Sequence, residues 1–278
     1  MRFRTEIERP RARFEIDHQR PVLLIGSCFT DEIGARLDDD GFTTVHNPLG
    51  PLYNPCSIAR CLELAATGIS ESDLTAGPRG WHCLDFASKY SGEKDHVVTA
   101  VNQGLASIKN MLEQKPVVII TLGSAFVFRH LESQRIVGNC HKFPADCFGR
   151  ELLTVEQASK ALKKAIELLH AYGCCDIIFT VSPIRHLADG LHGNTVSKST
   201  LQLAVDALEG VDYFPSYEIV LDDLRDYRFY AADMKHPSEV AVDYIYEIFS
   251  DTYFSKTTRA KALECRRASL ASKHRSIL

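Results

Sequence analysis

Apolar runs of strand length alternate along the chain with segments whose apolar residues recur at helical spacing. The runs at 21–26, 117–122 and 176–181 are nearly continuous, which is typical of strands buried on both faces of a parallel sheet. Strands are predicted at 21–26, 42–46, 117–122, 176–181, 211–214 and 219–221. Helices are predicted at 30–39, 57–66, 98–114, 154–172, 197–208 and 237–249. This alternation predicts an α/β protein, a three-layer α/β/α sandwich with a mainly parallel sheet.

Local signals place several helix ends. Thr154 and Gln157 form a capping-box pattern at the start of the clearest helix, and Gly173 closes that helix. Thr30 and Ser57 are expected to cap the helices that follow them, because a hydroxyl can accept a hydrogen bond from a free first-turn amide.

Four segments lie outside the regular alternation. Residues 1–20 predict an edge strand or a wrap-around arm, and 67–96 are rich in turn residues, with Trp81 and Phe86 as anchors. A hairpin excursion is predicted near 125–145. The sequence therefore predicts one domain over 1–255 and a charged C-terminal tail over 256–278, either a loose helix or disordered.

Composition narrows the classes of partner. The 278 residues are 45% hydrophobic and carry a net charge of -4, so a large core is expected and a nucleic-acid partner is not. No apolar run reaches membrane-span length and no signal-like segment is visible, which predicts a cytoplasmic protein without a membrane partner. The nine cysteines are scattered without a Cys-x-x-Cys pair, so reduced thiols are expected, with no metal and no cofactor.

The first candidate for chemistry is Ser27, which follows the strand 21–26 and precedes a helix. A hydroxyl there would lie at the carboxyl edge of the sheet, near helix amides that can hold an oxyanion. Cys28 is the alternative nucleophile. Neighbouring side chains point apart, so only one of the two can face a base. Ser27 is preferred because a thiol beside a buried strand is usually inert packing.

Asp233 and His236 supply a matching base. They precede the last predicted helix, in the segment Ala232-Asp233-Met234-Lys235-His236-Pro237-Ser238. An Asp three residues before a His can fold back onto Nδ1, fix the tautomer and stabilise the imidazolium that forms when His accepts a proton. Together the three residues predict a Ser27–His236–Asp233 triad.

Several segments resemble a known family. The order Ser, Asp, His, with the last two close together near the C-terminus, resembles the SGNH hydrolase superfamily, and the sequence resembles the GSCFA family within it. The resemblance runs from about residue 20 to 250, with Thr30 where the family name has Ala. Its segments are Gly26-Ser27-Cys28-Phe29, Asn47-Pro48-Leu49-Gly50-Pro51-Leu52-Tyr53-Asn54-Pro55, Thr121-Leu122-Gly123-Ser124, Asn139-Cys140-His141-Lys142, Thr180-Val181-Ser182-Pro183-Ile184-Arg185-His186, Tyr213-Phe214-Pro215-Ser216-Tyr217-Glu218, and Asp233-Met234-Lys235-His236-Pro237-Ser238.

The resemblance implies an SGNH hydrolase-like (flavodoxin-like) sandwich and an oxyanion hole completed by a Gly amide and an Asn side chain. Gly50 matches the Gly. The Asn is absent after the strand 117–122, where the sequence reads Gly123-Ser124-Ala125-Phe126. Ser124, or Asn139 reaching back from the hairpin, is the predicted replacement donor.

Further polar residues are expected near the same edge. His141, Lys142, Arg185 and His186 either bind an anionic or sugar substrate or belong to a surface hairpin and a solvated loop.

Three functions are compatible with these residues. The first is a serine-dependent hydrolase of an O-acyl ester on a carbohydrate or another small molecule. The second is an O-acyltransferase that uses the same triad, as found in the wider superfamily. The third is a non-catalytic binding protein on an SGNH scaffold, which the missing Asn favours. The oligomeric state is left open.

Overall fold

The computed structural model describes residues 4–77, 80–87 and 89–275. Five strands form one sheet in the order β2-β1-β6-β10-β11, and each pairs with its neighbours in parallel. Numbered along the chain this is 2-1-3-4-5, the flavodoxin-like order. The strands are β1 (Val22–Gly26), β2 (Thr44–His46), β6 (Val117–Leu122), β10 (Ile177–Val181) and β11 (Asp212–Tyr213).

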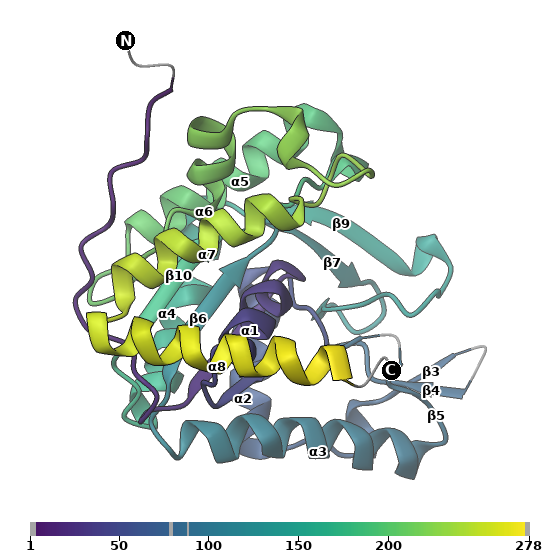
Figure 1. Cartoon of the computed structure of the whole chain (residues 1–278). Coiled ribbons are helices and arrows are strands. Elements are labelled where there is room, and N and C mark those ends of the chain that lie inside the picture. Colours follow the sequence, from purple (N-terminus) through teal and green to yellow (C-terminus); the bar gives the residue numbers. More distant parts are fainter. Residues whose placement is uncertain (1–3, 78–79, 88, 276–278) are drawn as a thin grey trace.

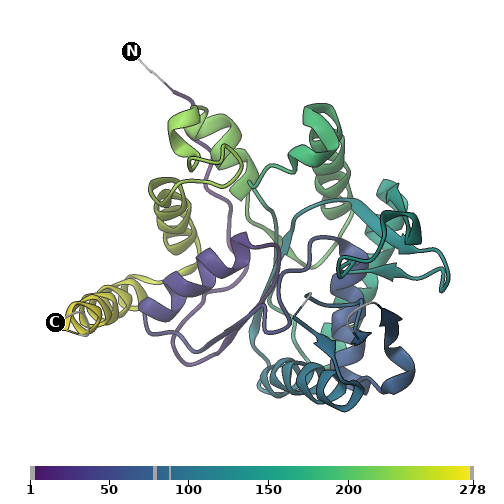
Figure 2. The same ribbon diagram turned by 90° about the vertical axis from the view of Figure 1, so that its right-hand side faces the viewer.

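Helices cover both faces of this sheet, as Figures 1 and 2 show. One face packs against α1 and α7 and the other against α2, α3, α4 and α5, each through its own hydrophobic cluster. The predicted three-layer α/β/α sandwich with a mainly parallel sheet is therefore confirmed. The helices are α1 (Phe29–Asp39), α2 (Pro55–Thr67), α3 (Lys94–Leu112), α4 (Val155–Ala171), α5 (Gly190–Asp206), α6 (Ser216–Glu218), α7 (Glu239–Tyr253) and α8 (Lys256–Arg275).

Two small antiparallel sheets extend from the sandwich. One contains β3 (Thr75–Gly77), β4 (Gly80–His82) and β5 (Ser91–Gly92); the other contains β7 (Phe126–His130), β8 (Ile136–Val137) and β9 (Phe148–Leu152). The predicted hairpin thus gains a third strand. Single 3-10 turns lie at Glu71–Asp73, Ala145–Cys147, Leu187–Asp189 and Tyr227–Phe229.

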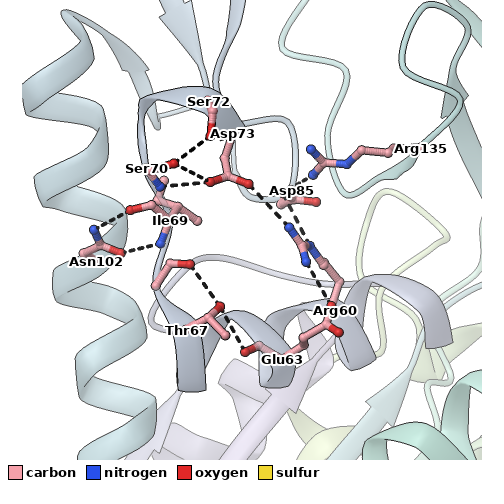
Figure 3. Close-up of polar contacts among 11 residues, drawn as sticks. Arg60, Glu63, Thr67, Ile69, Ser70, Ser72, Asp73, Asp85, Asn102 and Arg135 are labelled. Carbon is pink, nitrogen blue, oxygen red and sulfur yellow. Dashed lines mark hydrogen bonds and ion pairs between the residues drawn. The ribbon is translucent and has the colours of Figure 1, made fainter.

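A buried carboxylate joins these extensions to the sandwich (Figure 3). Asp85 accepts a 2.7 Å hydrogen bond from Arg135, beside β8, and lies 4.0 Å from the guanidinium of Arg60 on α2. The same guanidinium lies 3.6 Å from Asp73 in the turn before β3. Since the side chain of Asp85 is only 4% exposed, the two arginines offset the cost of burying its charge.

Several predicted element boundaries shift. Residues 219–221, predicted as a strand, begin a π-helix at Ile219–Leu224, because Ile219, Val220 and Leu224 are buried at helical rather than alternating spacing. Helix α2 is capped by Asn54, which accepts a hydrogen bond from Ser57, rather than by Ser57 itself. Helix α5 begins seven residues before the predicted start at 197. The capping box of α4 is present with both of its hydrogen bonds.

The two terminal segments lie against the sandwich. The described part of the N-terminal arm, from residue 4, contains no strand; it passes along β11 and α7 through hydrogen bonds from the Arg13 amide to Asp212 and from the Ile16 amide to Tyr253. The segment after Ser255 forms α8, which lies beside α1 and holds the buried Asp40 through Arg266. None of the helices described is both long enough and apolar enough to cross a membrane.

The end of β1 has room for no side chain at Gly26. A Cβ added there would lie 2.1 Å from the carbonyl oxygen of Thr121 on β6. Gly26→Ala should therefore lower the free energy of unfolding by about 2 kcal/mol or more, by forcing the two strands apart. Gly149→Ala, in β9, is the matched control. Its Cβ would meet nothing closer than 3.5 Å, and a change within about 0.5 kcal/mol is expected in urea denaturation. Equal stability of the two variants would contradict this account of the strand end.

Candidate active site

The side chains of β1 alternate between the two core clusters. Val22 and Leu24 pack with α1 and α7, whereas Leu23 and Ile25 pack with the opposite helices. Continued beyond Gly26, this alternation sends the Ser27 side chain toward the α2–α5 face and that of Cys28 toward the α1–α7 face. Cys28 is partly buried against the α1–α7 cluster, in agreement with this direction of its side chain.

Ser27 is built into the sheet. Its amide donates a 3.0 Å hydrogen bond to the Thr121 carbonyl, which completes the pairing of Gly26 with Thr121 at the end of β1. The side chain is 0% exposed, and its hydroxyl makes no hydrogen bond within the described part of the chain. A Cβ added to Gly123 would lie 3.2 Å from Ser27 Cβ, so this side chain points into the packed interior.

Cys28 is the residue that meets the base. It is the N-cap residue of α1, is partly exposed, and places Sγ 3.7 Å from Nε2 of His236. The hydroxyl of Ser27, the predicted nucleophile, makes no hydrogen bond to His236 in the described part of the chain, and the neighbouring thiol is the group in contact with Nε2.

His236 makes the predicted contact with Asp233. Nδ1 lies 2.5 Å from Asp233 Oδ2, and the amides of Lys235 and His236 both donate to Oδ1. These hydrogen bonds, led by the His236 amide, hold the pKa of Asp233 well below its usual range. Because an ionised carboxylate only accepts, Nδ1 carries the proton of neutral His236, and Nε2 presents its lone pair to Cys28.

Arg185 positions the loop that carries this base. Its backbone amide donates to the Lys235 carbonyl, and its guanidinium donates to the Met234 carbonyl, both at 3.0 Å. The guanidinium also lies over the rings of Tyr227 and Tyr230. Arg185 was predicted as a substrate-binding or loop residue; the contacts it makes are those of a loop anchor.

The two backbone amides predicted as oxyanion donors are already used in hydrogen bonds, and the two side chains predicted as replacement donors contact their own neighbours. The Gly50 amide donates to the Asn47 carbonyl at 2.8 Å, and the Ser27 amide is used by the sheet. The Ser124 hydroxyl accepts from the Phe126 amide and contacts Ser197. The side-chain oxygen of Asn139 accepts from the His141 amide. None of these contacts involves Cys28 or His236.

His141 and its neighbour lie in the extension rather than at the thiol. The His141 ring is buried between His82, 3.3 Å away, and the Phe86 carbonyl, 3.0 Å away. Burial lowers its pKa, so the ring stays neutral. His141 and Lys142 both have positive φ, in the turn that follows β8. This arrangement matches the alternative of a structural hairpin.

Tyr53 and His186 form one wall beside Cys28. Their rings meet edge to face at 5.6 Å. The Tyr53 hydroxyl favours the ionised form of the nearby thiol, and burial raises the pKa of Tyr53 to about 12, so it remains a donor. The pKa of His186 falls to about 4, first through burial and then through nearby cations, and its Nε2 is buried without a partner among the described residues.

Asn47 fastens the turn that carries Ser27 and Cys28. Its side-chain oxygen accepts from the Gly26 amide, and its side-chain nitrogen donates to the Ser27 carbonyl and to Asp31. The residue is 9% exposed and adopts a positive φ of 39°, which Asn tolerates better than most residues.

Sequence reasoning missed three of these positions. Tyr53 and Asn47 lie in the proline-rich loop after β2, and nothing in the loop pattern singled them out. Lys198 on α5 did carry a signal, because Asn194, Lys198, Leu201 and Val205 share one helical face that is otherwise apolar or neutral. A lysine in that row is either a snorkelling surface residue or a buried charge, and the structure shows burial.

The described residues contain no group of three or more His, Cys, Asp or Glu side chains placed to hold a metal ion. The chemistry offered by the site is that of its side chains: a thiol at a helix N-terminus, an imidazole facing it, and a carboxylate that orients the imidazole. A thiol, an imidazole and a carboxylate placed in this way at the carboxyl edge of a parallel sheet can act together as nucleophile, base and orienting group.

Comparison with known proteins identifies the family of the chain. The model of the GSCFA family matches residues 21–249, and the chain belongs to this family. Among solved structures the chain is similar to a Clostridium thermocellum family 3 carbohydrate esterase, at 13% identity and a TM-score of 0.34, over 87% of this chain and 98% of that one. At this TM-score the likeness does not bear on activity. A search of curated proteins found no significant match.

Asn47 and Ser27 should differ sharply in their contribution to stability. Asn47→Ala removes three hydrogen bonds, two of them to buried backbone, and should lower the free energy of unfolding by about 2–3 kcal/mol. Ser27→Ala removes only a buried hydroxyl that has no partner among the described residues, so stability should stay the same or rise by up to about 1 kcal/mol. Chemical denaturation measures both. A loss at Ser27 as large as that at Asn47 would show that the hydroxyl is bonded.

Proposed function

We propose that the protein is a cysteine-dependent acyl hydrolase in which Cys28 is the nucleophile, His236 the general base and then acid, and Asp233 the residue that orients His236. The observation that carries this proposal is the 3.7 Å approach of Cys28 Sγ to His236 Nε2, with Asp233 2.5 Å from the opposite ring nitrogen. This geometry supports acyl transfer through a covalent enzyme intermediate.

The reaction has two halves. His236 Nε2 takes the thiol proton, Sγ bonds to the carbonyl carbon of an acyl ester, and the carbonyl oxygen becomes an oxyanion. The C–O bond then breaks, the leaving alcohol takes the proton from His236, and a thioester remains on Cys28. A water molecule, deprotonated by His236, attacks the thioester and releases the acid and the thiol. Asp233 keeps Nδ1 protonated throughout and stabilises the imidazolium.

Hydrogen-bond donors at the start of α1 support the oxyanion. Cys28 is the N-cap residue, and no backbone acceptor for its amide is found among the described residues. The Thr30 and Asp31 amides of this turn donate to the Ser27 and Cys28 carbonyls, so the support comes from the Cys28 amide and from the helix dipole, which favours negative charge at this point. The Tyr53 hydroxyl, protonated and adjacent to the thiol, is the side-chain donor that we assign in place of the missing Asn.

The resting site holds a thiol rather than a preformed thiolate. Burial raises the pKa of Cys28, although its own amide and the Tyr53 hydroxyl act in the opposite direction. Deprotonation therefore depends on His236 and is completed when a substrate occupies the site. This property favours activated acyl esters as substrates, since a thiol that gives its proton to a general base is a good nucleophile toward an ester carbonyl.

Separate substitutions of Cys28 and Ser27 by Ala distinguish the thiol from the hydroxyl as the nucleophile. Cys28→Ala should abolish the burst of alcohol released from a chromogenic acyl ester, because no atom remains to form the acyl-enzyme. Ser27→Ala should retain a burst of wild-type size, since the hydroxyl is buried away from His236. Stopped-flow absorbance measures both bursts. Loss of the burst in Ser27→Ala, with Cys28→Ala still active, would reverse the assignment and restore Ser27 as the nucleophile.

Asp233→Asn tests the orientation of the base. An Asn oxygen can still accept the amides of Lys235 and His236, so the turn should survive, but Nδ1 loses its ionised partner. The rate constant of acylation should fall by about a hundredfold or more while substrate binding changes little. Asp226→Asn is the matched control, because Asp226 is an exposed carboxylate that also accepts a local amide and pairs with Arg228. Comparable loss in both variants would remove Asp233 from the mechanism.

A further inference from the structure

A small cavity lies beside the loop that carries His236. Its volume is about 200 Å³, and it is lined by residues of the loop after β10, of the π-helix Ile219–Leu224 and of the segment that follows this helix: Arg185, Val220, Leu221, Arg225, Asp226, Tyr227 and Tyr230. Two of these residues also support the base. Arg185 donates to the Met234 carbonyl, and Tyr230 pairs with Pro237, the neighbour of His236. A group bound in this cavity would therefore lie against the supports of the base loop.

Arg185 keeps unused donors beside this cavity. Of its guanidinium nitrogens, Nη1 donates to the Met234 carbonyl at 3.0 Å, and no other hydrogen bond of the side chain is found among the described residues. The guanidinium lies 5.7 Å from the ring centre of Tyr227 and 5.5 Å from that of Tyr230, and these contacts hold the cation without using a donor. Nε and Nη2 remain. Together they form a side of the guanidinium that can pair with both oxygens of a carboxylate.

Arg185 also lacks a counter-charge. No Asp or Glu of the described chain forms an ion pair with it. The other charged lining residues have partners of their own: Arg225 lies 3.4 Å from Asp222, and Asp226 lies 2.9 Å from Arg228 and accepts its amide. The cavity therefore favours one negative charge. A monoanion fits better than a dianion, because the Asp226 carboxylate lines the same cavity.

The remaining walls of the cavity are apolar. Val220 is buried, Leu221 is partly buried, and the rings of Tyr227 and Tyr230 complete the lining. A volume of about 200 Å³ equals that of roughly seven water molecules, so the cavity fits a small molecule of a few carbon atoms. A guanidinium fork among apolar walls is complementary to a carboxylate on a short hydrocarbon chain, because the charge and the chain each find a matching surface.

We propose that this cavity binds the carboxylate of a small organic acid, with both carboxylate oxygens on Nε and Nη2 of Arg185 and the hydrocarbon chain against Val220 and Leu221. The site goes beyond the acyl hydrolase activity and does not depend on it. Because the same guanidinium holds the Met234 carbonyl, a bound acid is tied through one side chain to the loop that carries His236.

Two ligands of the same shape test the charge of the bound group. Butyrate should bind with saturation at millimolar concentration. Butyramide, which has no charge, should bind at least about tenfold more weakly, because hydrogen bonds between charged groups are stronger than neutral ones. Binding is measured by NMR at constant ionic strength, through the Nε–Hε signal of Arg185 in protein labelled with nitrogen-15. The Arg185→Met variant identifies this signal by its absence.

A carboxylate built into the wall tests the location of the site. Leu221→Glu places a negative charge in the cavity that Arg185 lines, so the response of the Arg185 signal to butyrate should disappear. Leu221→Gln has the same size without the charge and should keep the response. Arg9→Met is a further control, because Arg9 is exposed on the N-terminal arm and pairs with Asp251, outside the cavity. Its binding curve should equal that of wild type.

Three results would overturn the proposal. The first is equal affinity for butyrate and butyramide in the wild-type protein, which needs no variant to fold. The second is equal binding of butyrate by folded Leu221→Glu and Leu221→Gln. The third is saturation by inorganic phosphate at a lower concentration than by butyrate, which would assign the cavity to phosphate. None of these measurements uses an ester or changes Cys28, so failure of the proposed function, seen in the bursts of Cys28→Ala and Ser27→Ala, is a separate result.

Discussion

The whole site depends on one hydrogen bond, that from the Ser27 amide to the Thr121 carbonyl. It completes the pairing of Gly26 with Thr121, the last pair of β1 and β6. The Ser27 side chain is buried in the interior, and Cys28 is the first side chain beyond the strand that packs on the α1–α7 face. If the pairing ended one residue earlier, it would not determine which of the two side chains lies in the interior and which faces His236.

The elements around the turn hold the Ser27 and Cys28 side chains in these orientations. Gly26 allows the close approach of Thr121, and Asn47 holds the backbone on both sides of the same peptide. On the opposite side, Arg185 fixes the loop that brings His236 back from the chain's C-terminal third. Nucleophile and base therefore come from segments more than two hundred residues apart. Each is tied to a strand end of the same sheet, so the rigidity of the parallel sheet maintains their distance.

Sequence reasoning recovered the parts of this molecule that local pattern determines. Continuous apolar runs located β1, β6 and β10, and the three-residue spacing of Asp233 and His236 predicted a contact that is present. The choice between Ser27 and Cys28 lay beyond it, because that choice depends on where a ladder between distant strands ends. A thiol beside a buried strand is usually inert, which favoured Ser27, yet the Cys28 thiol lies at the helix N-terminus and the Ser27 hydroxyl lies in the core.

Other differences have the same origin. The segment beginning at Ile219 has the composition of a strand, but its buried positions follow a helix because the neighbouring cluster covers one side of it. Gly50 and Ser124 have the residue types expected of oxyanion donors, but their groups are used within the loops that carry them. Residue type was thus predictable, and the partner of each polar group was not. Lys198 on α5 shows this most clearly, since it donates to the carbonyls of Gly123 and Ser182, just after β6 and β10.

The central claim is that the acyl group is carried by sulfur rather than oxygen. It is tested most directly by acid-quenching the protein during turnover of an acyl ester, and then measuring the intact mass before and after treatment with neutral hydroxylamine. A thioester reacts readily with this reagent, whereas an ordinary oxygen ester largely resists it. The account predicts one acyl group per chain, lost on treatment and located by peptide mapping at Cys28. An acyl group that survives the treatment and maps to Ser27 would contradict it.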